Sequence, residues 1–421
     1  MNNRCRSSIS LFALFILSSG CSPIIFDKLS AKTSECSYTG TPVLVDDHLY
    51  QADKSQFLDN VFVTDQGSWI GVGVVYLSTT ITGGTVTNGS NAVALIRRSN
   101  DQGATWTSST YQLESGKVTK INGVIQKGAS LLAYGYENSA SNLSSALVLE
   151  STDDGVTWNK KSAFNDGGVN TQFSTRNSAL VADDGTIYLG YHRGSVGNLA
   201  KSENGGATWG NVASFLVTGA TASTIQAVRA IDSTHLLIAG SSSDANGNYA
   251  VAWKLDLTNN ISTVLKQHRV GNALHAYYFD AIPYGSGFLL SGRDTAADGT
   301  NRALIHYVNP DGTPSTQDIQ YQWYAGYTAG LYEIMPFGNR FILMGYSFDP
   351  DLVNKGNAMV MSYTPGATTP ELIQNYRVHT GVHANIHGHA VTSDGDLLMA
   401  VYSNEASNTI NAWRMMKIPC N

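Results

Sequence analysis

The sequence has few charged residues, few prolines and one short apolar run. Asp, Glu, Lys and Arg make up 14% of its 421 residues, the formal net charge is −6, and there are 10 prolines. An acidic chain argues against nucleic acid or an anionic lipid surface as a partner. The apolar run at residues 9–17 is too short to span a membrane, and no sustained helical periodicity follows it. Glycine, in contrast, occurs 41 times, as expected for a chain with many tight turns.

Cysteine is also scarce, and two of the four cysteines lie within the first 21 residues. Arg4 and Arg6 precede the apolar run, which ends in Ser-Ser-Gly-Cys at positions 18–21. This order resembles a bacterial lipoprotein signal, which implies cleavage before Cys21 and a lipid on its thiol. Ser18 departs from the pattern, where Leu is usual, and an ordinary secretory signal is the alternative.

The leader divides the chain into three parts. We expect a signal peptide at residues 1–20, a lipidated N-terminus and tether at 21–35, and a single folded domain at 36–421. Loss of the leader removes two arginines, so the net charge becomes −8. The leader predicts export, with the lipid anchor as the sole contact with a membrane. Ser22 stands where enterobacterial lipoproteins of the inner membrane have Asp, so the resemblance implies the outer membrane in an organism that has one.

The pattern Ser-x-Asp-x-Gly-x-Thr-Trp occurs three times at nearly even spacing. The copies occupy residues 99–106, 151–158 and 202–209, so the first Ser recurs after 52 and then 51 residues. Such a period indicates stacked supersecondary units. Each copy lies between two extended stretches, which predicts a hairpin turn. There the Asp would accept backbone N–H groups, the Gly would adopt a positive φ, and the Trp would pack on apolar surface.

These turns resemble the Asp-boxes, or BNR repeats, of the sialidase-like β-propeller superfamily. The resemblance implies a propeller and gives the motif residues a structural role. It implies little about activity, because the superfamily includes sialidases, other glycosidases, assembly factors, sorting receptors and non-catalytic binders. The residues assigned to the boxes are Asp101, Trp106, Asp153, Trp158, Asn204 and Trp209.

A second recurring feature is an apolar strand that ends in a small residue. It occurs seven times, and Val401 replaces Gly in the last copy. Units of roughly 50 residues with four short strands are typical of propeller blades. We therefore predict an all-β fold, a β-propeller with seven four-stranded antiparallel blades; six blades, as in sialidases, are the alternative. The seven strands lie at residues 69–73, 131–135, 187–190, 236–240, 288–292, 341–345 and 397–401.

The two ends of the folded domain are expected to meet. The N-terminal strand of a propeller commonly completes the last blade, and residues 42–45 match antiparallel pairing with residues 413–418. That pairing would bring Cys36 beside Cys420. An exported protein can hold a disulfide. We therefore expect a disulfide that closes the ring, with two free buried thiols as the alternative.

Propellers bind ligands at the central channel, which the innermost strand of each blade lines. Alignment of the last four inner strands places four polar residues at one register position, on one face of each strand. One interpretation is a ligand pocket with a cation and paired carboxylates; the other is an ion-pair network that satisfies the channel wall. Aromatic residues at 277–278 and 321–324 match sugar-stacking surfaces or blade packing. The four polar residues are Arg229, Asp280, Glu333 and His389.

Sialidase activity is not expected from the arginines. A sialidase holds its substrate carboxylate with three arginines, the first in a motif ahead of the first Asp-box, but residues 57–63 contain no Arg. Other glycoside hydrolysis needs only two carboxylates, for which Asp280 and Glu333 are the candidates, with Arg229 orienting the substrate. The one plausible arginine triad is Arg176, Arg229 and Arg293.

The remaining expectations concern metals and partners. His383, His387 and His389 share a strand face, but residues two apart lie about 7 Å apart, so neither a metal site nor a cofactor is predicted. The sequence favours a monomeric, non-catalytic propeller that binds a glycan or a protein partner at the cell envelope. A glycoside hydrolase and an envelope assembly or scaffold factor are the alternatives.

Overall fold

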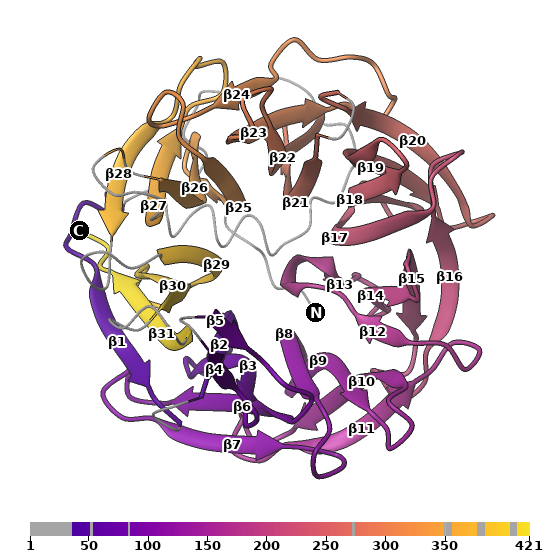
Figure 1. Ribbon diagram of the computed structural model, residues 1–421, viewed down its shortest axis with the longest axis vertical. Helices are drawn as coiled ribbons and strands as arrows, with labels where there is room; N and C mark the ends of the chain where they lie inside the picture. The colour runs from indigo at the N-terminus through magenta and orange to yellow at the C-terminus, as the bar shows by residue number, and fades with distance from the viewer. Residues whose placement is uncertain are drawn as a thin grey trace, which may run out of the picture.

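The chain folds into a ring of seven antiparallel sheets around a central channel (Figure 1). Each sheet has four strands except the third, whose inner strand is divided in two. The predicted seven-bladed, all-β propeller is therefore confirmed, and no α-helix occurs among the described residues. The computed structural model describes residues 36–50, 54–82, 85–271, 274–348, 350, 356–376, 384–404 and 411–421.

The blades follow one another in chain order, with their strands counted from the channel outward. The first has β2 (Gln56–Val63), β3 (Trp69–Tyr76), β6 (Ala92–Ser99) and β7 (Thr107–Tyr111), and a small hairpin, β4 (Thr80–Thr82) with β5 (Thr85–Thr87), follows β3. The second has β8 (Thr119–Lys127), β9 (Ser130–Asn138), β10 (Ser144–Ser151) and β11 (Asn159–Phe164). The third has β12 (Thr171–Phe173), β13 (Ala179–Val181), β14 (Ile187–Arg193), β15 (Val196–Ser202) and β16 (Gly210–Phe215).

The remaining four blades repeat this order. The fourth has β17 (Ala222–Ala230), β18 (His235–Asp244), β19 (Gly247–Asp256) and β20 (Ile261–His268). The fifth has β21 (Ala276–Tyr284), β22 (Gly287–Thr295), β23 (Asn301–Val308) and β24 (Ile319–Tyr321). The sixth has β25 (Ala329–Phe337), β26 (Arg340–Phe348), β27 (Gly356–Tyr363) and β28 (Glu371–Tyr376). The seventh has β29 (Ala384–Val391), β30 (Leu397–Asn404), β31 (Asn411–Ile418) and β1 (Val43–His48).

A bulge in the inner strand accounts for the recurring glycine. In six blades one extra residue interrupts the pairing of the first strand with the second, as between Tyr278 and Asp280 in β21. The inner backbone there lies against the second strand, so a Cβ on Gly292 would be 2.1 Å from the carbonyl oxygen of Tyr277. A Cβ on Gly345 would meet a carbonyl oxygen at 2.0 Å. A side chain does not fit at these positions, which explains the glycine in five of the six bulged blades; the seventh has Val401 there, opposite Ile386.

The third blade departs from this pattern because its inner strand is broken. β12 and β13 both pair with β14, and the 3-10 helix η1 (Arg176–Ser178) separates them. The break places Asn177 within hydrogen-bond distance of Glu333 in the sixth blade. No feature of the sequence repeat predicts this interruption.

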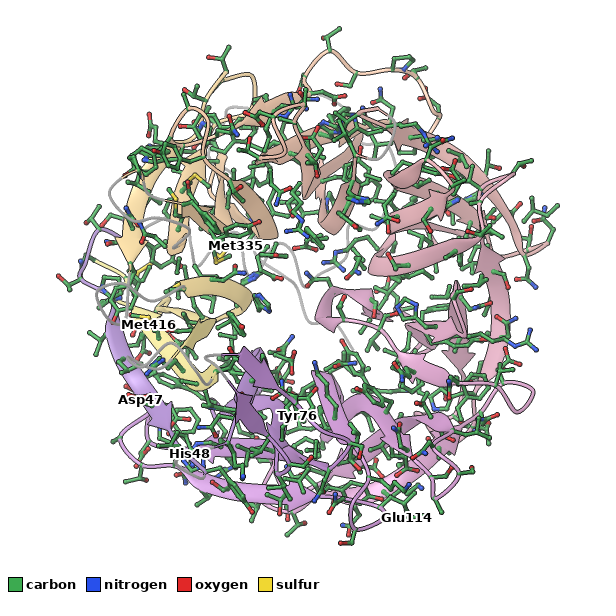
Figure 2. All side chains as sticks on the ribbon, in the orientation of Figure 1. Asp47, His48, Tyr76, Glu114, Met335 and Met416 are labelled. Carbon is green, nitrogen blue, oxygen red and sulfur yellow. A yellow bond between two sulfur atoms is a disulfide. The ribbon has the colours of Figure 1, made fainter. Side chains whose placement is uncertain are left out.

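The N-terminal strand closes the ring as predicted. β1 pairs antiparallel with β31, from Val43 opposite Lys417 to His48 opposite Trp413. Figure 2 shows His48 on this strand at the outer rim. Cys36 and Cys420 form a disulfide, so the predicted pairing is confirmed and the alternative of two free thiols is wrong.

A buried ion pair joins the closing strand to the first blade. Nε and Nη2 of Arg97 in β6 donate to the two carboxylate oxygens of Asp46 in β1, each at 2.7 Å. Nε1 of Trp413 also donates to Asp46, at 3.0 Å. All three residues are buried. The bidentate geometry is the strong form of this interaction, so the pair reinforces the seam where the two ends of the chain meet.

Apolar clusters fill the spaces between neighbouring blades. Ile70 and Val72 of β3, for example, pack with Ile121 of β8 and Leu131 of β9. Full burial of one such side chain contributes roughly 1.5–3 kcal/mol. The core is therefore distributed around the ring, blade against blade. Among the described residues, no helix is long and apolar enough to cross a membrane.

Candidate functional site at the central channel

Asp280 and Arg229 form an ion pair in the channel wall. Nη2 of Arg229 lies 2.5 Å from Oδ1 of Asp280. Asp280 also accepts backbone N–H groups from Ala281 and Ile334, and it is only 1% exposed. Both oxygens of this carboxylate are therefore engaged. The other N–H groups of Arg229 donate to carbonyl oxygens of Ala281, Asn177 and Val228.

Glu333 and His389 form the second pair. Nδ1 of His389 lies 2.9 Å from Oε2 of Glu333, and Nδ2 of Asn177 donates to Oε1 at 3.0 Å. Glu333 is also only 1% exposed. Asn177 connects the two pairs, because its carbonyl oxygen accepts from Arg229 while its side chain donates to Glu333. Sequence reasoning missed Asn177, because it belongs to the break in the third blade rather than to the repeat.

The four predicted residues converge, but they do not share one register position as predicted. Asp280 and Glu333 do occupy equivalent positions, opposite the residue that precedes the recurring glycine. His389 lies one position further along its strand and Arg229 two positions further. The reason is the loop between the first and second strands. It has two residues in the fifth and sixth blades, four in the fourth and five in the seventh, so residues at similar distances along the chain lie at different positions in the sheets.

The surroundings of Asp280 shift the pKa of its carboxyl group. Burial raises the pKa of Asp280 to about 6; the charge of Glu333 adds to the rise, and Arg229 and His389 oppose it.

Two surface hollows lie away from these carboxylates, one of about 320 Å³ beside Trp158 and one of about 260 Å³ beside Tyr277. Neither hollow is lined by Asp280 or Glu333. This geometry favours the ion-pair interpretation over an open pocket.

A row of aromatic rings lies at the mouth, the end of the channel at which the inner strands begin. Phe279, Tyr332 and His387 are the bulged residues of β21, β25 and β29. Each ring of the row has its centroid 4.6 to 6.0 Å from the next, and all are half-buried. Tyr76, the last ring, lies on the inner side of the first blade (Figure 2). This aromatic belt consists of Tyr277, Phe279, Tyr332, His387, Tyr402, Phe57 and Tyr76.

The same bulge positions are polar in the other half of the mouth. They hold Asp59, Asn122 and Gln226 in the first, second and fourth blades. Asp59 pairs with Lys120 at 2.8 Å, and Asn122 donates to a backbone carbonyl. Gln226 accepts from the Thr175 hydroxyl. These side chains are thus held by protein partners, and the aromatic half is chemically distinct.

The arginines do not assemble the triad of a sialidase. Arg229 is committed to Asp280 and to backbone carbonyls. Arg293 packs its guanidinium over the rings of Tyr277 and Phe279, at 5.5 and 5.9 Å, and donates to the hydroxyl of Tyr346. The side chain of Arg176 lies outside what the structure describes.

The other predicted aromatics and histidines divide between the belt and the core. Tyr277 joins the belt, whereas Tyr278 is fully buried and bonds to His306. Tyr321 and Trp323 pack against each other and the core of the sixth blade, as the packing interpretation expects. His383 and the lipidation residue Cys21 lie outside the described residues. In the part of the chain that is described, no three His, Cys, Asp or Glu residues are grouped to hold a metal ion.

The Asp-box turns have the predicted geometry. Asp101 accepts from the backbone N–H and the hydroxyl of Thr105, at 2.9 and 2.5 Å, and Gly103 has φ +88°. The second box repeats these bonds. In the third, Asn204 accepts the N–H of Thr208 but donates to its hydroxyl, so the turn survives the loss of charge. Nε1 of each Trp donates to the carbonyl of the box glycine, which fixes the three rings of Trp106, Trp158 and Trp209.

Fold and turns together define a β-propeller with Asp-box repeats. Residues 66–266, just under half of the chain, match the BNR repeat-like domain family, and the chain as a whole is a seven-bladed β-propeller. No curated protein sequence matches the chain.

Solved structures of similar fold have low sequence identity. The polysaccharide lyase Uly1 is 10% identical, over 87% of this chain and 90% of its own, with a TM-score of 0.51. A Dyadobacter fermentans protein of unknown function is 14% identical, over 90% and 98%, with a TM-score of 0.48. Trypanosoma rangeli sialidase is 12% identical, over 90% of this chain but 59% of its own, with a TM-score of 0.47. The likeness concerns the fold alone.

Proposed function

We propose that the protein binds a glycan at the channel mouth without cleaving it, and that a lipid on Cys21 holds it at the cell envelope. The aromatic belt is the observation that carries this proposal. Electron-rich ring faces attract the C–H groups of a sugar ring, and a half-buried ring loses little freedom on binding. Because the belt crosses four blades, it suits a chain of several sugar units rather than one.

The state of the carboxylates supports binding over cleavage. Glycoside hydrolysis requires two carboxyl groups that reach the substrate, about 5 or 6.5–9.5 Å apart. Asp280 and Glu333 are both buried, and their oxygens bond to Arg229, His389, Asn177 and backbone N–H groups. A substrate would have to displace these partners before either carboxyl group could act.

Removal of belt rings tests the proposal. With the purified full-length protein, a ligand found on a glycan array is titrated by calorimetry against Tyr332→Ala and Tyr402→Ala. Each variant should bind about tenfold more weakly, because one stacking ring is lost. Tyr321→Ala is the matched control, since Tyr321 is a half-buried ring on the outermost strand of its blade. Equal losses in all three variants, or none in the belt variants, would contradict the proposal.

A glycoside hydrolase with Asp280 and Glu333 as its carboxyl groups is the second candidate. One observation favours it: a pKa of about 6 suits a general acid near neutral pH. An assay for new reducing ends separates the two candidates. Glycan that is bound but not shortened supports the binder, whereas cleavage that Asp280→Asn abolishes supports the hydrolase.

The remaining expectations belong to the same proposal. The protein acts as a monomer and has no nucleic-acid partner. If its ligand is instead an envelope protein, or if it assists envelope assembly, that protein should co-purify with it, less of it should co-purify with the belt variants, and no glycan should bind. Incorporation of labelled fatty acid, lost in Cys21→Ala, tests the anchor.

A further inference from the structure

We infer that the hollow between the third, fourth and fifth blades binds one uncharged sugar unit at the end of the aromatic belt; this inference rests on the proposed glycan binding. The hollow measures about 260 Å³, which is below the range of about 300–1,000 Å³ typical of pockets for drug-sized ligands. It therefore suits a single small unit. It lies where β14 and β18 end and β17 begins, at the same mouth as the belt.

The lining of the hollow is rich in hydroxyl groups. Adjacent serines at the end of β18 face the start of β17, where Thr224 Oγ1 lies 2.8 Å from Ser241 Oγ. Hydroxyl groups both donate and accept, so they can match the hydroxyls of a sugar without a fixed polarity. The serine and threonine hydroxyl groups of the lining belong to Ser195, Ser223, Thr224, Ser241, Ser242 and Ser243.

Ser242 supplies an independent observation. It is 1% exposed, it lines the hollow, and its Oγ has no hydrogen-bond partner among the described residues. A buried hydroxyl without a partner carries its full desolvation cost, so native structures rarely leave one. By contrast, Ser223 accepts the N–H of Gly197 at 2.9 Å. Thr119, Ser174, Ser291 and Ser362 also have a buried hydroxyl without a partner among the described residues, but Ser242 is the one of these five that lines the hollow, so a ligand hydroxyl there would satisfy its Oγ.

The charges around the hollow select an uncharged ligand. Among the described residues, no Asp, Glu, Lys or Arg lines it, and burial lowers the pKa of His192, which keeps that ring neutral at neutral pH. Asp244, next to Ser243, is paired with Arg269 at 2.6 Å. The nearby cation Arg293 packs on the Tyr277 ring. A uronate would gain no partner within the hollow and would lose its hydration.

Tyr277 connects the hollow to the belt. Its ring belongs to the lining of the hollow and stacks on Phe279 at 6.0 Å, and its hydroxyl accepts from Asn248. A glycan that follows the belt from the seventh blade to the fifth reaches the hollow with its next unit. The hollow then recognises that unit by hydroxyl contacts, while the belt holds the rest by stacking.

The test compares neutral and charged probes on the full-length protein. Xylotetraose, cellotetraose, maltotetraose and tetragalacturonate are titrated by calorimetry against the parent protein and Ser242→Ala. We expect at least one neutral probe to bind better than tetragalacturonate, and Ser242→Ala to weaken that probe about tenfold. Ser362→Ala is the matched control, since its Oγ is also buried and unpartnered but lies in β27 of the sixth blade.

The outcomes separate this inference from the proposed function. Undiminished affinity in Ser242→Ala, an equal loss in Ser362→Ala, or a preference for the uronate overturns the hollow as a sugar site. If Tyr332→Ala still weakens binding in that case, the proposed glycan binding stands without the hollow. If none of the probes or array glycans binds, both fail.

Discussion

The first three blades have Asp-box turns on one face of the ring, and the aromatic belt lies on the other, across the last three blades and the first. The faces follow from strand direction: an Asp-box joins the third strand to the fourth, whereas the belt lies where the inner strands begin. Both sets of blades build the same four-stranded sheets. The boxes are therefore not required for a blade, and the chemistry of the mouth varies independently of the outer turns.

A turn without a box shows how little of the motif a blade needs. In the fifth blade, residues 309–313 begin the connection from β23 to β24. Asp311 accepts the N–H of Thr313 at 2.9 Å, and Gly312 has φ +79°. The acceptor and the glycine remain while the Trp is gone. The side-chain acceptor and the positive φ thus make the turn, and the Trp adds a contact between blades.

The largest loss of stability is expected from removal of the disulfide that closes the ring. Cys36→Ser with Cys420→Ser removes the disulfide between the closing strand and the last blade, whose loop spans 384 positions. Loop entropy predicts a loss of about 6 kcal/mol in the free energy of unfolding. Urea unfolding followed by circular dichroism measures it, and reductant should lower the parent midpoint but leave the variant unchanged. An unaltered midpoint in the variant would mean that the strand pairing and the Asp46–Arg97 pair suffice to close the ring.

A smaller loss of stability is expected when one aspartate side chain is removed from either region. Asp280→Ala leaves Arg229 without its carboxylate and two buried N–H groups without an acceptor, so we expect a loss of about 3 kcal/mol at pH 7. Asp153→Ala removes an exposed acceptor whose donors water can satisfy, and its loss should be clearly smaller. Urea midpoints at pH 7 measure both. Equal losses would show that the box matters to the fold as much as the channel network does.

The sequence predicts the fold well because each blade repeats a steric requirement. The glycine within the second strand is visible in sequence since in five blades the bulged inner backbone excludes a side chain there. The disulfide was predictable because ring closure brings the two chain ends together. The broken inner strand of the third blade was not, because the third blade has the same apolar strand and glycine at residues 187–190 as the blades whose inner strand is continuous.

The candidate site was predicted only in part. Arg229, Asp280, Glu333 and His389 do converge, but loops of different length between strands displaced two of them from the assumed register. The belt was not predicted because its bulged residues depart from the alternation of side chains between the two faces of a strand. Its contacts also join blades that are far apart in sequence, such as Phe57 with Tyr402 at 5.5 Å. Such contacts depend on how the ring closes, which residue spacing does not encode.

The two regions should also respond to pH with opposite sign. Hydrogen bonds from Thr105 and Thr157 lower the pKa of Asp101 and Asp153 from 3.8 to about 2. Their stabilisation is complete above about pH 4 and disappears as the pH falls toward 2. Burial raises the pKa of Asp280 to about 6, so the folded state keeps a proton that the unfolded chain has lost. Stability from this group therefore declines as the pH rises from about 4 to 6.

Urea unfolding between pH 2 and 7 separates the two contributions. Asp280→Asn should remove a slope of about 1 kcal/mol per pH unit between pH 4 and 6. Asp101→Asn with Asp153→Asn should remove part of the fall in stability below pH 4 and leave the pH dependence above pH 4 unchanged. Asn204→Ala is the control, because Asn204 stands at the box aspartate position without a charge to titrate, so its variant should parallel the parent at every pH. If Asp280→Asn parallels the parent as well, then Arg229 holds Asp280 ionised throughout, and the channel network is an ordinary ion pair rather than a protonated carboxyl.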